Sequence, residues 1–474
     1  MSGVIEQPRF TCALGGQQTV LAIPGARPIV HAGPGCSMKI MEFSSMNAGR
    51  QGEGCGGGTH ISCTNTYEQE VVFGGEKKLR ATIEGAFKVI KGDLFVVLSG
   101  CTADIVGDDT INITKAYAEE GWPIVGVETS GFKGTSYYGH ETVVNGIIEQ
   151  FVGDTRGTPR EGLVNVFSVV PFQNPYWRGD LENLKSLLRS IGLEVHILFG
   201  YGSQGVSEWK DIPNAQCNLL VSPWVGLSTV KLLEEKYGTP YLHYPVLPFG
   251  AQETSRFLRE VGSYLGIPQE RIDEVIETEE RRFYRYLSSM VDFLSEYRSN
   301  LPWELYTVAD SAYAAGASVF LTNELGFIPK GVYIVDDTAQ NFQEAVAASI
   351  VSRNADFKGL VQFETDGGLI QQDIRNKLEG SHKALFLGSG WEKFLAQSTG
   401  NSCSFLSLPL PETVILGKSF IGYSGGINLA EEIYSDLFKT KAHFSRQTVF
   451  IETPATDPGG GTRALVTRST AYVL

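Results

Sequence analysis

The chain has 474 residues, of which 42% are hydrophobic and 19% charged, a balance typical of a globular protein with about two to four domains and not of a disordered one. Its 39 basic and 53 acidic residues give a net charge of −14, which argues against nucleic acid or an anionic membrane as a partner. Seven cysteines are too few for a disulfide framework, and the sequence shows no signal peptide and no apolar run of roughly twenty residues, so we expect a reduced, cytoplasmic protein.

Three cysteines in glycine-rich turns mark the first quarter of the chain: Cys12, Cys36 and Cys101. The last two follow apolar runs, residues 27–31 and 94–98, that predict buried strands. Ligands of open α/β sheets collect at the carboxyl ends of the strands, so thiols far apart in the sequence can converge there. Thiolates on glycine turns suit an iron–sulfur cluster, whereas small buried apolar cysteines are the alternative, and these residues alone leave both open.

A glycine-rich stretch over residues 47–63 predicts a loop that covers a site or lies under a partner, because so much glycine disfavours a regular element. Cys55, His60 and Cys63 could bind a metal ion there. Three ligands in a loop are an incomplete set, so a loop without metal is the favoured interpretation.

Three successive alternations of strand and helix patterns predict three doubly wound α/β domains. The expected domains cover residues 1–158, which carry the cysteines and begin with an arm over 1–26, residues 159–300, which end in a long charged helix, and residues 301–440. A tail over 441–474 is expected to contact another subunit. The predicted elements are strands near 94–98, 122–127, 164–170, 195–199, 217–221, 240–245, 331–335, 357–363, 384–387 and 405–409, and helices near 72–90, 180–191, 227–237, 268–298, 342–351 and 425–438.

Other motifs carry less. Gly200, Gly202 and Gly205 have the spacing of a dinucleotide-binding loop, but no evident helix with an acidic partner follows, so we do not expect a nucleotide there. The scattered histidines are expected to be hydrogen-bonded structural groups; those concerned are His31, His140, His196 and His243.

Several segments resemble the nitrogenase component 1 family, which includes nitrogenase-like reductases and cofactor-assembly scaffolds. The most specific is Cys-x4-[IV]-Gly-Asp-Asp, here within residues 100–109. Weaker likeness continues along the chain, so the resemblance covers nearly all of it. The further matching segments are residues 12–16, 31–36, 72–75, 131–134, 234–240 and 422–426.

The resemblance implies three Rossmann-like domains and an iron–sulfur cluster at the interface of an α-type and a β-type subunit in an α2β2 heterotetramer. Carried over, Cys12, Cys36 and Cys101 become the cluster ligands. The favoured cluster is the 8Fe-7S P-cluster type, and a 4Fe-4S cluster of the protochlorophyllide or chlorophyllide reductase kind is the alternative. In oxidised P-clusters a β-type hydroxyl adds from the residue before the Phe of a Ser-Phe-x-Gly turn. This chain has Gly131 there, with Ser130 adjacent as a weaker candidate ligand.

Two positions favour the β-type subunit. In the family's α-type subunits one cysteine and one histidine hold the active-site cofactor, and the matching positions here are Ser222 and Ile421. Serine and isoleucine cannot replace a thiolate and an imidazole on iron. The resemblance therefore implies a subunit with no catalytic residue of its own, which relays electrons from an ATP-dependent iron protein to a cofactor in the α-type partner.

The favoured substrate is a methylthio-alkane, reduced at its carbon–sulfur bond as in methylthio-alkane reductase. This preference depends on the glycine-rich residues 52–59 and the short N-terminal arm, which differ from the β subunits of the dinitrogen enzymes. Dinitrogen reduction and a cofactor-maturation scaffold without turnover are the alternatives. A metal-free α/β binding protein is the alternative that needs no cluster.

Overall fold

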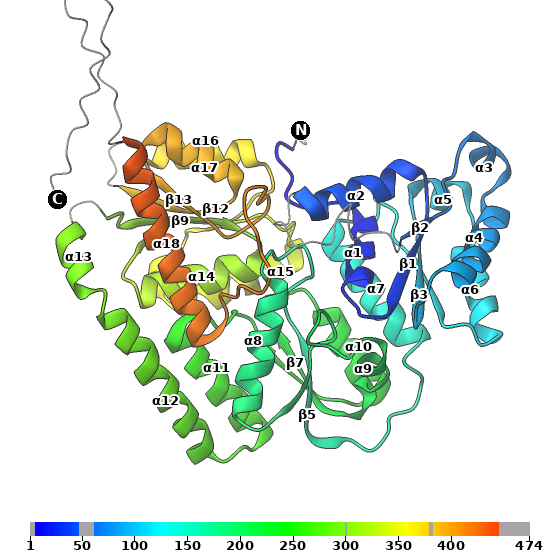
Figure 1. Ribbon diagram of the computed structural model, residues 1–474, viewed down its shortest axis with the longest axis horizontal. Helices are drawn as coiled ribbons and strands as arrows, with labels where there is room; N and C mark the ends of the chain where they lie inside the picture. Colours follow the sequence, from blue (N-terminus) through cyan, green and yellow to red (C-terminus); the bar gives the residue numbers. More distant parts are fainter. Residues whose placement is uncertain (1–4, 47–60, 299–300, 379–382, 445–474) are drawn as a thin grey trace, which may run out of the picture.

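The computed structural model describes residues 5–46, 61–298, 301–378 and 383–444, which form three parallel sheets covered by helices (Figure 1). This arrangement confirms the predicted α/β class with Rossmann-like parallel sheets. Each sheet falls within one of the three predicted domains, whose boundaries stay a prediction. Among the described residues, no helix is both long enough and apolar enough to span a membrane.

The first sheet has the strand order β2-β1-β3-β4. All six residues of β3 are buried, as expected for a parallel strand with helices on both faces. Helices α4 and α6 cover one face through Leu79, Ile83 and Ile113, and α1 and α7 cover the other. The elements are η1 (Ala13–Gly15), α1 (Gly16–Leu21), β1 (Ala26–His31), α2 (Pro34–Met46), β2 (Ser62–Cys63), α3 (Glu68–Phe73), α4 (Glu76–Val89), β3 (Leu94–Ser99), α5 (Cys101–Val106), α6 (Thr110–Glu119), β4 (Ile124–Glu128) and α7 (Ser136–Gln150).

The second sheet has the order β6-β5-β7-β8. Leu181, Leu184 and Leu188 recur at helical spacing on α8 and are buried, so this amphipathic face packs onto the sheet. The elements are β5 (Arg160–Phe167), α8 (Trp177–Ser190), β6 (Glu194–His196), α9 (Val206–Lys210), η2 (Ile212–Asn214), β7 (Ala215–Val221), α10 (Leu227–Tyr237), β8 (Tyr241–Tyr244), α11 (Gly250–Leu265), α12 (Gln269–Ser288) and α13 (Val291–Tyr297).

The third sheet has the order β11-β10-β9-β12-β13. Its last helix, α18, packs against α11 and α12, so the end of the described chain returns to the second unit (Figure 1). The elements are β9 (Glu304–Ala309), α14 (Ser311–Asn323), β10 (Ile328–Ile334), α15 (Gln340–Val351), η4 (Ala355–Phe357), β11 (Val361–Phe363), α16 (Gly367–Leu378), β12 (Ala384–Gly388), α17 (Gly390–Thr399), β13 (Ser402–Phe405) and α18 (Gly422–Phe444).

Several predicted elements need correction. The arm over residues 1–26 contains η1 and α1, whose residues Gln17, Gln18 and Thr19 are buried against the first sheet's core. The long helix over 268–298 is interrupted at Ser289 and Met290, where α12 ends and α13 begins. The sequence patterns also missed β9 and α14, the centre of the third sheet and its buried helix.

The buried histidine of α7 gives a pH prediction. Burial lowers the pKa of His140 to about 3, and its Nδ1 lies 2.9 Å from Thr19 Oγ1. The unfolded chain, whose histidine pKa is near 6.5, takes up a proton before the folded protein does. The contribution of His140 to stability is therefore present above about pH 6.5 and is lost as the pH falls toward the folded pKa. The wild-type protein should therefore lose stability between pH 7 and pH 5, at about 1.4 kcal/mol per pH unit below the unfolded pKa. In His140→Gln this loss should be smaller by roughly 2 kcal/mol, because glutamine does not titrate. Urea unfolding of both proteins at the two pH values measures this difference; parallel pH profiles would contradict it.

Candidate functional site

Cys12, Cys36 and Cys101 come together at the carboxyl edge of the first sheet. Cys36 lies in the first turn of α2, after β1, and Cys101 is the first residue of α5, after β3. Cys12 precedes η1 and forms an isolated bridge with Thr135, in the turn after β4. A Cβ built on Gly131 in that turn would lie 3.1 Å from the Cys12 Cβ and 3.3 Å from the Cys101 Sγ. A side chain at position 131 would therefore be in tight contact with both cysteines, and glycine lets the turn lie close to both.

The Cys36 thiol interacts electrostatically with its neighbours. Partial burial raises its pKa, and negative charge on Cys12, Cys101 and Cys63 would raise it further. Several thiolates at one edge repel one another unless a cation lies among them. Thiolates bind soft metal cations, iron among them, so the chemistry of the set suits such a cation.

The turn after β4 supplies two further features that fit an iron–sulfur cluster. The Gly131 N–H donates to Cys101 Sγ at 3.0 Å, and hydrogen bonds of this kind tune cluster potentials. Ser130 is fully buried, and its hydroxyl has no hydrogen-bond partner within the described part of the chain. A buried hydroxyl without a partner is costly, so a group bound beside this turn would satisfy it.

No three His, Cys, Asp or Glu side chains of the described residues converge on one metal ion. Such convergence is a property of mononuclear sites, whereas the thiolates that hold a cluster are spread over several iron atoms. The predicted metal loop lies largely outside the described residues, which include neither Cys55 nor His60. Cys63 ends β2; its Sγ accepts from the Asn65 N–H at 3.4 Å and lies 3.4 Å from the Ala32 carbonyl oxygen.

A buried histidine–carboxylate pair lies next to the cysteine turns and connects their elements. His31 is fully buried, its Nε2 lies 3.0 Å from Asp108 Oδ2, and its Nδ1 lies 3.1 Å from Thr64 Oγ1. Burial lowers the pKa of His31, against the opposing effect of Asp108. The Gly75 N–H donates to Asp108 Oδ1 at 2.8 Å, and a Cβ on Gly75 would lie 2.6 Å from Asp108 Oδ2.

This network gives a structural role to two of the segments that match the family. Asp108 belongs to the Gly-Asp-Asp segment that follows Cys101, and His31 begins the segment that ends in Cys36. Together with Gly75 they tie the turn after α5 to β1 and to the start of α4. Sequence reasoning treats His31 as structural and does not pair it with Asp108, although both stand in matching motifs.

The two positions that separate the subunit types are buried. Ser222 follows β7 and is 2% exposed, and its carbonyl oxygen accepts from His243 Nε2 at 2.8 Å. Ile421 is fully buried, and its carbonyl oxygen accepts from Asn183 Nδ2 at 3.1 Å. Neither position offers a thiolate or an imidazole to a metal.

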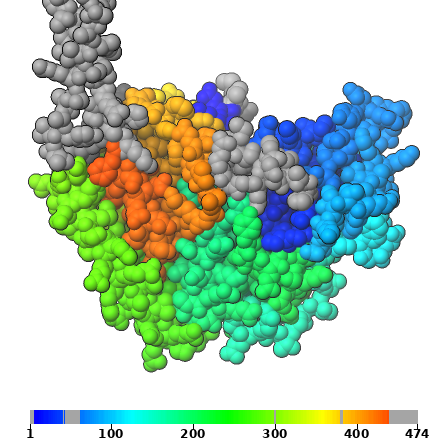
Figure 2. Space-filling model, in the orientation of Figure 1, coloured from blue at the N-terminus to red at the C-terminus, as the bar shows by residue number. Residues whose placement is uncertain are grey.

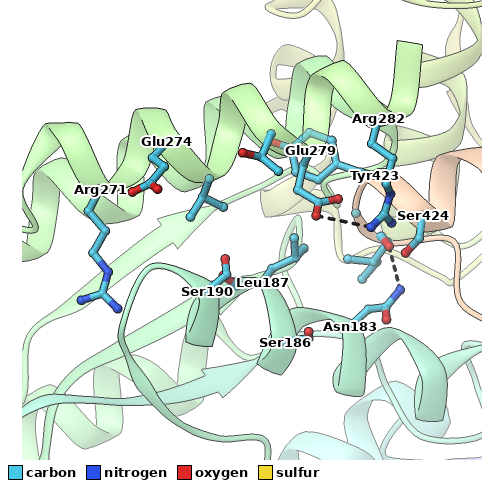
Figure 3. Close-up of a pocket in the computed structure, with 14 residues that line it drawn as sticks. Asn183, Ser186, Leu187, Ser190, Arg271, Glu274, Glu279, Arg282, Tyr423 and Ser424 are labelled. Carbon is cyan, nitrogen blue, oxygen red and sulfur yellow. Dashed lines mark hydrogen bonds and ion pairs between the residues drawn. The ribbon is translucent and has the colours of Figure 1, made fainter. Parts of the chain in front are cut away.

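A cavity of about 510 Å³ lies between α8, α12 and the start of α18. Figure 3 shows Glu279 paired with Arg282 on α12 and Asn183 reaching across from α8. The lining contains neither cysteine nor histidine and comes from the second unit and the start of α18, so it is separate from the cysteine site. The lining residues are Asn183, Ser186, Leu187, Ser190, Arg271, Glu274, Val275, Thr278, Glu279, Arg282, Ile421, Gly422, Tyr423 and Ser424.

Three parallel sheets with cysteines gathered at the edge of the first define a Rossmann-like α/β protein with a thiolate site. The model of the family described as "Nitrogenase component 1 type Oxidoreductase" matches residues 11–438, and the chain belongs to that family.

Known proteins resemble this chain over most of its length. The nitrogenase molybdenum-iron protein beta chain of Methanococcus maripaludis is 24% identical and aligns with 90% of this chain and 93% of its own length. The nitrogenase iron-molybdenum cofactor biosynthesis protein NifE of Methanococcus maripaludis is also 24% identical, over 94% of this chain and 86% of its own. The solved structure "Nitrogenase Cp1 at pH 6.5" superposes with a TM-score of 0.75 at 20% identity, covering 95% of this chain and 96% of that one. The beta-chain relative supports the β-type assignment, and the structural match establishes the fold.

Proposed function

We propose that this chain is the β-type, electron-relaying subunit of a nitrogenase-like reductase and holds an iron–sulfur cluster on Cys12, Cys36 and Cys101. The observation that carries the proposal is that Cys12 and Cys101 both lie against the position of Gly131 and that both interact electrostatically with Cys36. Relatives in the family are oxidoreductases, and the grouping of the thiols supports a redox cluster in this chain.

The residues of the chain would divide the work of holding the cluster. When bound, an iron–sulfur cluster accepts and passes on single electrons. The three thiolates would fix its position, and the Gly131 N–H would stabilise negative charge on Cys101. Ser130, buried and without a hydrogen-bond partner among the described residues, is a candidate for an additional oxygen contact.

The exposure of the site supports a cluster shared with a partner. Cys12 and Cys36 are exposed, and apolar side chains stand out around the cysteine turns: Met38 on α2 is 53% exposed, Ile105 on α5 is 75% exposed and Phe132 after β4 is 62% exposed. Exposed apolar groups of this kind favour a protein interface. We infer an α-type subunit in an α2β2 assembly as the partner, an ATP-dependent iron protein as the electron donor, and an 8Fe-7S cluster, with 4Fe-4S as the alternative.

The substrate we favour is a methylthio-alkane, which would be reduced on a cofactor in the partner. The absence of a thiolate and an imidazole at Ser222 and Ile421 supports placing the substrate site in the partner chain. Reduction of dinitrogen is the alternative, favoured by the molybdenum-iron beta chain among the relatives.

A second candidate function is a maturation scaffold that holds a precursor cluster without turnover. It is favoured by the equally strong similarity to a cofactor biosynthesis protein. A complex that turns over substrate with reductant and ATP supports the reductase, whereas transfer of a cluster to an acceptor without turnover supports the scaffold.

Anaerobic purification of the full chain with its co-expressed partner tests the proposal. We expect a brown complex that contains iron and sulfide and gives an electron paramagnetic resonance signal when its redox state is changed. A colourless, iron-free complex would overturn the cluster assignment.

A further inference from the structure

The start of the chain is anchored on the helices of the third sheet before it reaches the first sheet. The Glu6 carbonyl oxygen accepts from the Gly367 N–H at 2.9 Å, at the start of α16. Gln371 Nε2 donates to Gln7 Oε1 at 3.1 Å. Figure 2 shows the dark blue start of the chain against the yellow and orange residues of the third unit.

The strongest of these contacts is a buried ion pair. The Arg9 guanidinium donates to both carboxylate oxygens of Glu392, at 2.8 and 2.7 Å. Arg9 is 4% exposed and Glu392 is fully buried, and the guanidinium also lies over the Trp391 ring, 5.2 Å from its centroid. Two parallel charge-assisted hydrogen bonds fix orientation as well as distance.

The partner side of this pair is rigid. Glu392 is the third residue of α17 and forms a capping box with Ser389, whose N–H donates to Glu392 Oε2 at 2.9 Å. Burial alone would raise the pKa of Glu392, but Arg9 and Ser389 hold it below its usual range. Arg9 is therefore held by a helix terminus and not by a flexible surface side chain.

Directly after Arg9 the chain is fixed a second time, by hydrogen bonds to the turn after β4 and to the start of α7 in the first unit. The Ser136 N–H donates to the Thr11 carbonyl oxygen at 2.8 Å, and the Ala13 N–H donates to the Gly134 carbonyl oxygen at 2.9 Å. Cys12 stands between these two bonds. It thus lies three residues from an anchor on the third sheet and next to anchors on the first.

We propose that Arg9 is a positioning residue for the cluster ligand Cys12, acting through its buried ion pair with Glu392 on α17. This inference rests on the proposed function, because it treats Cys12 as a ligand. Cys36 and Cys101 follow β1 and β3 of the first sheet, whereas Cys12 also depends on the third unit. The position of Cys12, one of the three proposed ligands, then depends on how the first unit is placed relative to the third.

Glu392→Gln is the sharpest test. Glutamine can replace glutamate in a capping box, so the variant keeps α17 while removing the charge that Arg9 binds. Arg9→Lys is the second variant, since it keeps the positive charge and loses the paired contact. The matched control is Glu253→Gln, which breaks another buried pair, between Glu253 Oε1 and Arg353 Nε at 2.7 Å, away from the cysteine turns.

The first measurement needs no iron. Hydrogen exchange of the full chain reports the amides of Ala13 and Ser136, which bond across the Cys12 segment. We expect Glu392→Gln to speed their exchange at least about tenfold, because local opening becomes easier, and Arg9→Lys to act in the same direction. Glu253→Gln should leave both amides at the wild-type rate.

The second measurement uses the purified complex with its partner. We expect Glu392→Gln to change the electron paramagnetic resonance signal or midpoint potential of the cluster, and Glu253→Gln to leave both unchanged. Unchanged exchange in both pair variants overturns the proposal, and so does faster exchange with an unchanged signal in an iron-containing complex. An iron-free wild-type complex instead overturns the proposed function, and this inference with it.

Discussion

We expect Cys101→Ser to lose most of its bound iron while the chain keeps its fold. Serine fits the first position of α5 without a clash, because it is slightly smaller than cysteine and follows the extended cap residue Gly100. Its hydroxyl stays protonated at neutral pH and is a poor ligand for iron, whereas a thiolate is a good one. The hydrogen bond from the Gly131 N–H to Cys101 Sγ would no longer act on a ligand sulfur.

The measurement is the iron content of the anaerobic complex, with its electron paramagnetic resonance spectrum and its elution on a sizing column. We expect cluster affinity to fall by more than about tenfold, since even indirect contacts to a metal ligand contribute that much. Subunit association should weaken as well, because a shared cluster joins the two chains.

Cys217→Ser is the control for this experiment. Cys217 lies buried in β7, and burial raises the pKa of its thiol to about 12. Its Sγ lies 3.3 Å from the Asn218 carbonyl oxygen, so a serine hydroxyl can donate there. The control should keep its iron and its spectrum. Wild-type iron content and an unchanged spectrum in Cys101→Ser would contradict the ligand role of Cys101.

The sequence predicts well those elements whose residues show a local pattern. The run over 94–98 has the continuous apolar character of β3, and Leu181, Leu184 and Leu188 mark the buried face of α8. The cysteine edge could be predicted for a related reason. Strand, glycine turn and cysteine follow one another locally, and parallel topology brings the ends of neighbouring strands together.

The missed features lack a local pattern. Residues 311–321 of α14 are all buried, so this helix has no polar face and no amphipathic period. The Arg9–Glu392 pair joins positions 383 residues apart, and the pairing of His31 with Asp108 joins two separate motifs. The first contact depends on how the first and third units pack together, and the second on how elements of the first unit come together. Neither propensity nor spacing encodes these arrangements.

We expect Gly139→Ala to cost the chain about 3 kcal/mol or more of its stability, because the added methyl has no space. Gly139 lies in α7, and a Cβ there would be 1.9 Å from the Ala13 carbonyl oxygen and 2.8 Å from the Ala13 carbonyl carbon. These are backbone atoms, so no side-chain rotation can relieve the contact. Either α7 or the segment at η1 must move.

The same displacement should reach the cluster site, since Ala13 follows Cys12 and its N–H donates to the Gly134 carbonyl oxygen. Iron content of the complex should therefore fall together with the free energy of unfolding measured in urea. The control is Gly85→Ala in α4, where a Cβ would meet nothing within 4 Å. It should raise stability by up to about 1 kcal/mol, because alanine is the better helix former. Unfolding of both alanine variants at the same urea concentration would contradict the prediction, because it would show that close packing of α7 on η1 does not hold the Cys12 segment in place.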